Sequence, residues 1–346
     1  SDNYTLLTAQ QNGQYDEKSG DAGTELQKLE MMLRQSHIPS ELYDKAHLQL
    51  QRITMALKYS GNISQFDTIA KYVEWITSLP WEAKTNDVLD IKTATDIMNK
   101  NHYGLEQIKK RILEYLSILI MQNRSPGGGN AHAPILFFVG LAGTGKTTFA
   151  KSIADTLGRK FARIPFGGLS SALDLRGLSR VQPEAEPGQI IKALRRVQTK
   201  NPVILLDELD RITSESHAAV MGVLLELLDP EQNDHFVDHY IDFPVDLSQV
   251  LFIATANNTH TISTAVMDRL EPISMPSYTD QEKITIGKSY VLPKKLKMAG
   301  IPEGALVISE EVWPAIVRPL GFDAGIRTLE RTIDGVVRKV AKLIVE

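Results

Sequence analysis

The sequence predicts an α/β protein in which a mostly parallel sheet lies between helices, with a helical region before the sheet and a small helical domain after it. Short apolar runs alternate with stretches of helical spacing at residues 135–139, 162–166, 203–206 and 250–254. Such alternation is typical of parallel sheets that are covered on both faces. Before residue 99 and after Pro276, apolar residues recur at helical spacing without strand-like runs.

The flanking regions are predicted to be helical. Residues 1–23 are polar and glycine-containing, which predicts a flexible lead. In the helical region 24–98, Pro39 separates two helices, and a third over 64–79 ends before Pro80, because the residue before a proline is disfavoured in a helix. A large α/β domain is expected over 99–275. A small helical domain is expected over 276–346, with helices at 280–290, 309–317 and 325–345.

Composition excludes several classes of site. The chain has 346 residues, a formal net charge of −4 and no cysteine. It therefore forms no disulfide and no cysteine-ligated zinc site, and its charge gives no reason to expect nucleic acid as the main partner, although DNA binding stays open. No apolar run reaches about 18 residues, so no membrane span is predicted. The start at Ser1 lacks the features of a signal peptide and an initiator methionine, so we expect a processed or cut chain.

One loop indicates the chemistry. The apolar run 135–139 leads into a G-x-x-x-x-G-K-T motif, and helical spacing follows it. Backbone N–H groups of such a loop close around phosphates, Lys146 reaches the β- and γ-phosphates, and the Thr147 hydroxyl ligates Mg²⁺. The alternative is a chance glycine turn. The predicted phosphate contacts are Gly140, Ala142, Gly143, Thr144, Gly145, Lys146, Thr147 and Thr148.

Two further apolar runs end in polar residues that suit this loop. Asp207 and Glu208 follow 203–206, and carboxylates at that end of a parallel strand lie at the ligand-binding edge of the sheet. Asp207 would hold Mg²⁺, and Glu208 would deprotonate the attacking water. Asn257, after the run 250–254, would hold this water or touch the γ-phosphate. The alternatives are solvated acids at a strand end and a turn-forming asparagine.

Two arginines complete the predicted catalytic set. Arg269 ends a helical stretch, from which it would reach the γ-phosphate of a neighbouring subunit and stabilise developing negative charge. Arg327 opens the last helix and would close the helical domain onto the nucleotide. The alternatives are a surface arginine at 269 and, for Arg327, an ion pair with Asp323 or Glu330 within its own helix.

In this order, the phosphate loop, acid pair, sensor asparagine and two arginines resemble the AAA+ ATPases. Several stretches resemble the ATPase region of Lon-type ATP-dependent proteases, closely over 65–346 and more loosely over 24–64. They include Tyr72-Val73-Glu74-Trp75, His102-Tyr103-Gly104-Leu105-Glu106, Leu228-Asp229-Pro230-Glu231-Gln232-Asn233, Asp238-His239-Tyr240 and Gly325-Ile326-Arg327-Thr328-Leu329-Glu330-Arg331.

The resemblance implies a P-loop AAA+ large domain with a small helical domain, ATP or ADP with Mg²⁺ as ligands, and a homo-oligomeric ring, expected to be a hexamer. It also implies unfolded or misfolded proteins as substrates. The adenine pocket would be lined by His102, Tyr103, Gly104 and Tyr278, whose alternative role is core packing. A cytoplasmic location is expected, or the mitochondrial matrix for a eukaryotic source.

Two departures from the Lon pattern stand out. The family's protease domain would follow the last helix, so this sequence, which ends at Glu346, is not expected to cleave peptide bonds by that route. Gln182 and Pro183 occupy the positions where the family usually carries an aromatic-aliphatic pair that grips the threaded polypeptide. Three functions therefore stay open. They are the ATPase motor of a Lon-like protease, a stand-alone remodelling ATPase that does not thread polypeptide, and a nucleotide-gated assembly scaffold.

Overall fold

The computed structural model describes residues 23–60, 66–124, 135–302, 304–318 and 323–346, so that nearly all of the predicted lead over 1–23 lies outside the described residues. The chain forms two compact units. The first comprises the chain up to Lys84 together with Ala172–Lys200 and Asp234–Leu247, and the second comprises the remainder. Each is described by itself. The domain boundaries at 23, 98 and 275 remain predictions.

A five-stranded sheet forms the centre of the second unit. Its order is β2-β3-β6-β1-β7, and every neighbouring pair is parallel, which confirms the predicted sheet type. Four strands coincide with the predicted apolar runs within two residues. These strands are β1 (Ile135–Val139), β2 (Phe161–Pro165), β3 (Val203–Asp207) and β6 (Leu251–Ala256).

The fifth strand, β7 (Leu270–Ser274), is not among the strands predicted from the sequence. It pairs with β1 at the edge of the sheet, and only Leu270 and Ile273 of its side chains are buried. Pro272 lies inside it, and an edge position tolerates a proline that cannot donate a ladder hydrogen bond. The apolar run that identifies a central strand is therefore missing here.

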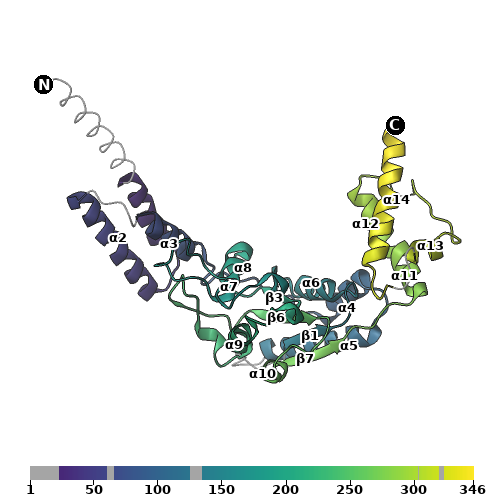
Figure 1. The fold of residues 1–346 in the computed structure, drawn as a ribbon, viewed down its shortest axis with the longest axis horizontal. Coiled ribbons are helices and arrows are strands. Elements are labelled where there is room, and N and C mark those ends of the chain that lie inside the picture. Colours follow the sequence, from purple (N-terminus) through teal and green to yellow (C-terminus); the bar gives the residue numbers. More distant parts are fainter. Residues whose placement is uncertain (1–22, 61–65, 125–134, 303, 319–322) are drawn as a thin grey trace. The chain divides into compact units, whose positions relative to one another are not determined.

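Three helices pack their apolar sides into the core that contains the sheet (Figure 1). Phe138 of β1 and Leu205 of β3 are fully buried in this core, together with Phe149 and Ile153. The helix that carries Phe149 follows the phosphate loop directly, so packing of this helix fixes the loop against the sheet. The helices are α4 (Ile91–Asn101), α5 (Glu106–Arg124) and α6 (Lys146–Leu157).

Short elements complete this part of the second unit. Helix α9 (His217–Leu228) buries Val220, Leu224 and Leu227, and it contacts α10 (Thr264–Met267). The 3₁₀ turns η1 (Phe166–Gly168) and η2 (Leu209–Arg211) lie in the connections, and η3 (Asn233–His235) begins at the last residue before the chain enters the first unit.

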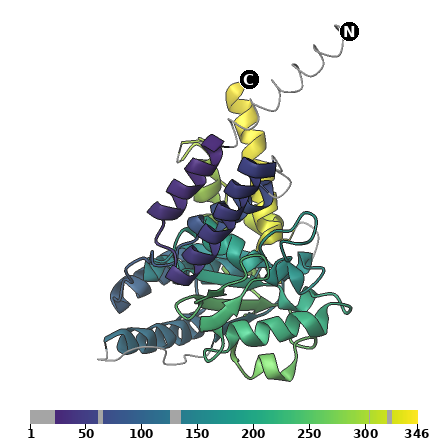
Figure 2. The same cartoon turned by 90° about the vertical axis from the view of Figure 1, so that its left-hand side faces the viewer.

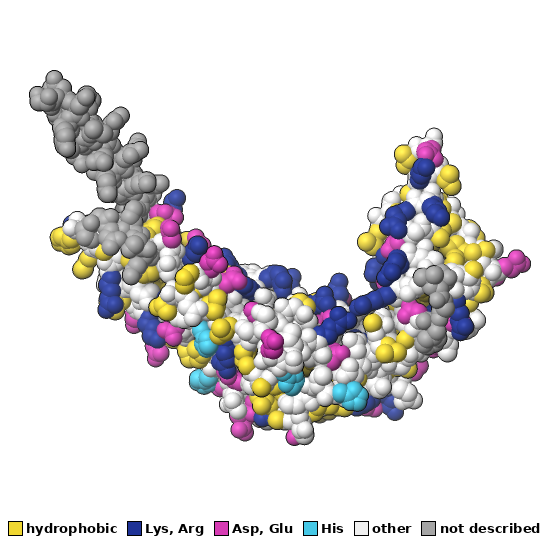
Figure 3. Space-filling model, in the orientation of Figure 1, with side chains coloured by type: hydrophobic (Ala, Val, Ile, Leu, Met, Phe, Trp, Pro, Cys, Tyr) yellow, Lys and Arg dark blue, Asp and Glu magenta, His cyan; other side chains and the backbone are white. Residues whose placement is uncertain are grey.

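The C-terminal helices form a separate small core around Trp313, Leu329 and Ile333. The predicted helix 280–290 is present and continues to Met298 through a π-helical turn. The predicted helix 309–317 is shorter than expected, whereas the last helix is long (yellow in Figures 1 and 2). On the visible face of these helices, lysine and arginine lie among exposed hydrophobic side chains (Figure 3). The elements are α11 (Asp280–Ile286), η4 (Gly287–Val291), α12 (Leu292–Met298), α13 (Trp313–Val317) and α14 (Arg327–Val345).

The first unit is mainly helical. Residues 23–35 are helical, α2 (Ser40–Ser60) starts after Pro39, and α3 (Phe66–Ser78) ends before Pro80, as predicted. Two short helices and an antiparallel pair of two-residue strands come from the later segments of the unit. They are α7 (Leu173–Arg176), α8 (Gln189–Val197), β4 (Phe236–Val237) and β5 (Pro244–Val245). Among the described residues of both units, helices that combine the length and apolarity needed to cross a membrane are absent.

Candidate functional site

The phosphate loop connects β1 to α6 at the carboxyl end of the sheet. Gly143 and Gly145 take left-handed conformations, with φ of 82° and 98°, which glycine adopts without strain. Helix α6 begins at Lys146, so the N–H groups of its first turn, which have no partner within the helix, lie next to this loop. Together these features form a site that favours anions.

Lys146 is buried and connects the loop to a neighbouring strand. Its Nζ donates to the carbonyl oxygens of Gly140 and Leu141, the latter at 2.9 Å, and to Asn257 Oδ1 at 3.2 Å. Burial lowers the pKa of Lys146, and the nearby Asp207 and Asp210 carboxylates oppose this shift. The ammonium is therefore held by carbonyl and amide oxygens, and the carboxylates of Asp207 and Asp210 lie near enough to act on its charge.

Asp207 ends β3 and is almost fully buried. Its Oδ1 accepts a hydrogen bond from the Thr255 hydroxyl on β6, and its Oδ2 accepts one from Arg163 Nε on β2 at 2.5 Å. Neither partner is among the residues predicted from the sequence. Each lies on a strand next to β3, and the alternation of β2 places Arg163 on its exposed side, but the strand order that joins them is not visible in the sequence.

Glu208 follows with an unusual backbone. Its φ of 61° and ψ of 52° are left-handed, which is uncommon for a residue with a side chain and is often found at functional sites. The Glu208 N–H donates to Thr255 Oγ1 at 2.9 Å, and its Oε2 lies 3.4 Å from Arg211 Nε. Thr255 therefore holds both acids, one through the side chain and one through the backbone.

Asn257 is held from two sides. Besides accepting from Lys146, it donates its backbone N–H to Asp210 Oδ1 at 3.0 Å and its side-chain amide to Asp210 Oδ2 at 3.2 Å. Asp210 was not identified from the sequence. The sequence places Asp210 three residues after Asp207, but its contact with Asn257 can be inferred only once β3 and β6 are known to be neighbouring strands.

The C-terminal helical domain meets the phosphate loop at the start of α14. The Ile326 N–H donates to the Gly143 carbonyl at 3.1 Å, and the Arg327 side chain lies against Gly143. The Tyr278 hydroxyl donates to the Thr144 carbonyl at 3.2 Å. The phosphate loop and this domain are thus joined by direct hydrogen bonds.

Most of the predicted phosphate-site residues surround a single hollow of about 140 Å³. Gly140 and Thr144 lie in the same loop, and the Thr144 hydroxyl donates to the Leu141 carbonyl. A larger hollow of about 910 Å³ lies in the first unit and contains none of the predicted ATP-site residues. The small hollow is lined by Ala142, Gly143, Gly145, Lys146, Thr147, Thr148, Asp207, Glu208, Asn257, Ile326, Arg327 and Glu330.

Other predicted residues are not part of this lining. Arg269 donates to Asp229 Oδ2 at 2.8 Å and to the Ala265 carbonyl at 2.9 Å. The His102 ring is buried and stacks on Phe149 with 3.6 Å between centroids. It also shares a 2.9 Å hydrogen bond with the Ser152 hydroxyl.

Burial lowers the pKa of His102 to about 4, and the Lys109 charge adds to this shift. Tyr103 is exposed, and Gly104 has a φ of 62°. The adenine contacts of His102, Tyr103 and Gly104 therefore remain predictions, as does the catalytic role of Arg269.

The donor set fits Mg²⁺ with a nucleotide. Within the described ranges, clusters of three or more histidine, aspartate or glutamate side chains able to hold a metal ion on their own are absent. Mg²⁺ does not need such a cluster, because it usually keeps several waters and takes one or two protein oxygens together with substrate phosphates. Asp207 and Thr147, which line the same hollow, would supply those protein oxygens.

Comparison with known proteins agrees with this geometry. Residues 136–277 match the profile of the ATPase family associated with various cellular activities (AAA), and residues 297–346 match the Lon protease AAA+ ATPase lid domain. The chain is 43% identical over 322 residues to a Lon protease of Lawsonia intracellularis. The aligned residues cover 93% of this chain and 38% of that protein. It is 40% identical over 329 residues to a Lon protease of Bacillus thuringiensis, which covers 95% of this chain.

A "Lon protease 2" of Thermus thermophilus is 40% identical over 328 residues. The chain thus spans about two fifths of the length of these relatives. The chain is an AAA+ ATPase region with a Lon-type lid, homologous to Lon proteases over most of its own length.

Proposed function

We propose that the second unit binds ATP with Mg²⁺ and hydrolyses it. The observation that carries this proposal is the convergence of Lys146, Asp207, Glu208 and Asn257 on one hollow beside the phosphate loop. A hollow of about 140 Å³ is smaller than the roughly 300–1,000 Å³ of pockets that enclose a whole ligand, so it would take the phosphate tail.

Each of these side chains would have a separate task. Lys146 would exchange its carbonyl partners for β- and γ-phosphate oxygens, which are stronger acceptors for an ammonium. Glu208 would accept a proton from the attacking water, and Asn257 would orient that water or the γ-phosphate. When bound, Mg²⁺ would neutralise charge on the phosphates, held by Asp207 and Thr147.

Two arginines would complete the site. Arg327, at the start of α14, lines the hollow and would contact the phosphates from the lid. Arg269 would act on the nucleotide of a neighbouring subunit in a homohexameric ring, for which its pairing with Asp229 would have to open. The AAA family assignment supports an oligomer.

We further propose that hydrolysis drives the unfolding and threading of protein substrates, as the motor part of a Lon-like ATP-dependent protease. The similarity to proteins named Lon protease supports this proposal. The second candidate is a remodelling ATPase that does not thread polypeptide. The loop after α7 favours it, because Val181 is 91% exposed at the loop tip and no aromatic residue follows it before Pro187.

Both proposals, ATP hydrolysis and the threading of protein substrates, are tested by one assay. Phosphate release by the purified chain is measured with ATP and Mg²⁺ in the presence and absence of unfolded casein. A threading motor predicts turnover that casein stimulates. A remodeller of other substrates predicts turnover without stimulation. Absence of turnover over the whole range of protein concentration in which rings form would contradict ATP hydrolysis and favour a nucleotide-gated scaffold.

A further inference from the structure

The loop 177–188 in the first unit is closed at its base by a buried carboxylate. The Asp238 side chain is fully buried, and its Oδ2 accepts from the Gly188 N–H at 2.7 Å. Its Oδ1 accepts from the backbone of Tyr240 at 2.8 Å and of Ile241 at 3.1 Å. A single carboxylate thus joins the end of the loop to the turn after β4.

The two arms of the loop touch each other at this base. A Cβ on Gly177 would lie 2.8 Å from both Asp238 Oδ1 and the Gly188 nitrogen, so only glycine fits there. Further along, the Leu178 N–H donates to the Glu186 carbonyl at 3.0 Å. The loop is therefore a narrow hairpin-like projection, and its longest exposed run is the tip at 181–184, with Ser179 and Glu186 also exposed on its two arms.

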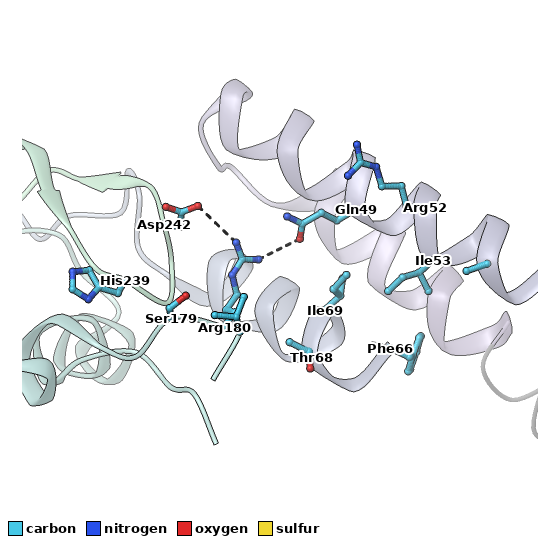
Figure 4. A pocket seen from close by; sticks show the side chains of 12 residues that line it. Gln49, Arg52, Ile53, Phe66, Thr68, Ile69, Ser179, Arg180, His239 and Asp242 are labelled. Atoms are coloured by element: carbon cyan, nitrogen blue, oxygen red, sulfur yellow. Dashed lines mark hydrogen bonds and ion pairs between the residues drawn. The ribbon is translucent and has the colours of Figure 1, made fainter. Parts of the chain in front are cut away.

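Arg180, directly before that tip, is held by side chains of three other segments. Its guanidinium carbon lies 3.7 Å from the centroid of the Tyr72 ring on α3. Its Nη1 donates to Gln49 Oε1 on α2 at 3.2 Å, and its Nη2 lies 3.9 Å from Asp242 Oδ2 (Figure 4). The Tyr72 hydroxyl donates in turn to the Ile241 carbonyl at 3.3 Å, so the ring is itself fixed.

These contacts require an arginine and could not all be made by a lysine. The planar guanidinium stacks on an aromatic ring while its edge donates to separate acceptors. Only 20% of the Arg180 side chain is exposed, whereas the adjoining Val181 is 91% exposed. Arg180 is therefore held by its contacts directly before the exposed tip begins at Val181.

We propose that Arg180 is a positioning residue that fastens the tip of the loop 177–188 to helices α2 and α3, so that the tip moves with the N-terminal helices. The two compact units of the chain agree with this proposal, because Ala172–Lys200 belongs to the same unit as the N-terminal helices. The consequence for substrates rests on the proposed function: force on a polypeptide held at the tip would pass through Arg180 into α2 and α3, and this path does not need an aromatic side chain at the tip.

A spin label at the tip tests the anchor directly. The chain has no cysteine, so Val181→Cys gives a single labelling site. We expect restricted motion of the nitroxide in the otherwise unchanged chain and nanosecond motion typical of free loops after Arg180→Ala. Arg180→Lys keeps the charge but loses the planar stacking, and an intermediate spectrum is expected.

Arg52→Ala is the matched control. Arg52 lines the same hollow of the first unit and is exposed, so its removal changes the charge of the hollow without touching the Tyr72 stack. We expect it to leave the spectrum unchanged. Equal spectra for Arg180→Ala and the unchanged chain would overturn the proposal, and so would equal effects of Arg180→Ala and Arg52→Ala. If Arg180→Ala unfolds, Tyr72→Leu removes the ring face and retains an apolar side chain, and it must release the tip in the same way.

The ratio of casein-stimulated to basal ATP hydrolysis gives the second readout. We expect this ratio to fall toward one in Arg180→Ala and to recover in part in Arg180→Lys. If the unchanged chain shows no stimulation, threading fails as a function, while the spin-label comparison still decides whether Arg180 anchors the loop. A mobile tip with full stimulation would refute the coupling.

Discussion

Lys146 Nζ lies 3.2 Å from Asn257 Oδ1, and this contact joins the phosphate loop after β1 to the carboxyl end of β6. Asp210 holds the same asparagine from the other side through its backbone and its amide. The residue that would bind phosphate and the residue that would sense it therefore contact each other directly. Displacement of the lysine toward a phosphate would be felt directly at Asn257.

Lys146→Ala should weaken nucleotide binding. A hydrogen bond to a charged group contributes about 1.5–3 kcal/mol, so we expect the Kd for ATP to rise roughly 10- to 150-fold. Lys151→Ala is the control, because Lys151 lies on the same helix and is exposed. Titration of a fluorescent ATP analogue measures both. Equal affinities for the two variants would remove Lys146 from the site.

Gly325→Ala should weaken the contact between the lid and the phosphate loop. An added Cβ would lie 2.5 Å from the Ala142 carbonyl oxygen and 2.6 Å from Gly143 Cα, so the backbone must shift. Overpacking of this kind costs about 1–3 kcal/mol, and we expect nucleotide affinity to fall by about tenfold.

Gly335→Ala is the matched control for the lid. Gly335 lies within α14, and nothing is within 4 Å of the added Cβ. Alanine in a helix interior is favoured over glycine by about 1 kcal/mol, so this variant should be slightly more stable and bind nucleotide normally. A loss of affinity in Gly335→Ala as large as in Gly325→Ala would show that the lid contact is not responsible.

Arg269→Ala should separate catalysis in a neighbouring subunit from ion pairing within the chain. An arginine finger accelerates hydrolysis by about 10³–10⁵-fold, so we expect a loss of that order where rings form. The hydrogen bond from Arg269 is the main cause of the lowered pKa of Asp229. Asp229→Asn removes the negative charge that pairs with Arg269, while the amide oxygen can still accept the hydrogen bond from the Glu231 N–H. This variant should retain turnover. If both substitutions reduce the rate equally, Arg269 acts through Asp229 and not on the nucleotide.

His102 should make stability depend on pH in the acid range. Its folded-state pKa of about 4 lies below the ordinary value of 6.5, so the unfolded chain binds the proton more readily between these values. Stability is therefore fully present above pH 6.5 and is lost as pH falls toward 4, by up to about 3 kcal/mol.

Melting temperatures at pH 7.5 and pH 5 test this effect. His102→Gln cannot be protonated and keeps a group that can bond to the Ser152 hydroxyl. Its melting temperature should fall less between the two pH values than that of the unchanged chain. An identical fall in both proteins would show that another group titrates.

Much of the fold could be predicted from local sequence patterns, because these patterns agree with the burial that each element has in the folded chain. The runs that became β1 and β3 are apolar throughout, as central strands must be, and Pro39 and Pro80 bound α2 and α3 as expected. By contrast, β7 contains Glu271 and Pro272 and depends on its neighbour β1 for strand structure. No local pattern identifies such an edge strand.

The site shows the same division. Asp207 ends a recognisable strand, Lys146, Glu208 and Asn257 come after one, and all four line one hollow. Arg163 and Thr255 became visible only through the strand order, because β2, β3 and β6 are adjacent in the sheet and far apart in sequence. The left-handed backbone of Glu208 likewise arises from tertiary contacts that oppose its own preference.

The most direct test is to measure ATP binding and ATP hydrolysis side by side in the unchanged chain and in Glu208→Gln, with Glu215→Gln as the exposed control. The amide preserves the shape of residue 208 but cannot accept the proton, and Asp207 and Thr147 remain for Mg²⁺. We predict normal ATP affinity with turnover lost in Glu208→Gln, and normal values for both in Glu215→Gln. Turnover at the unchanged rate in Glu208→Gln would contradict the assignment of Glu208 as the base.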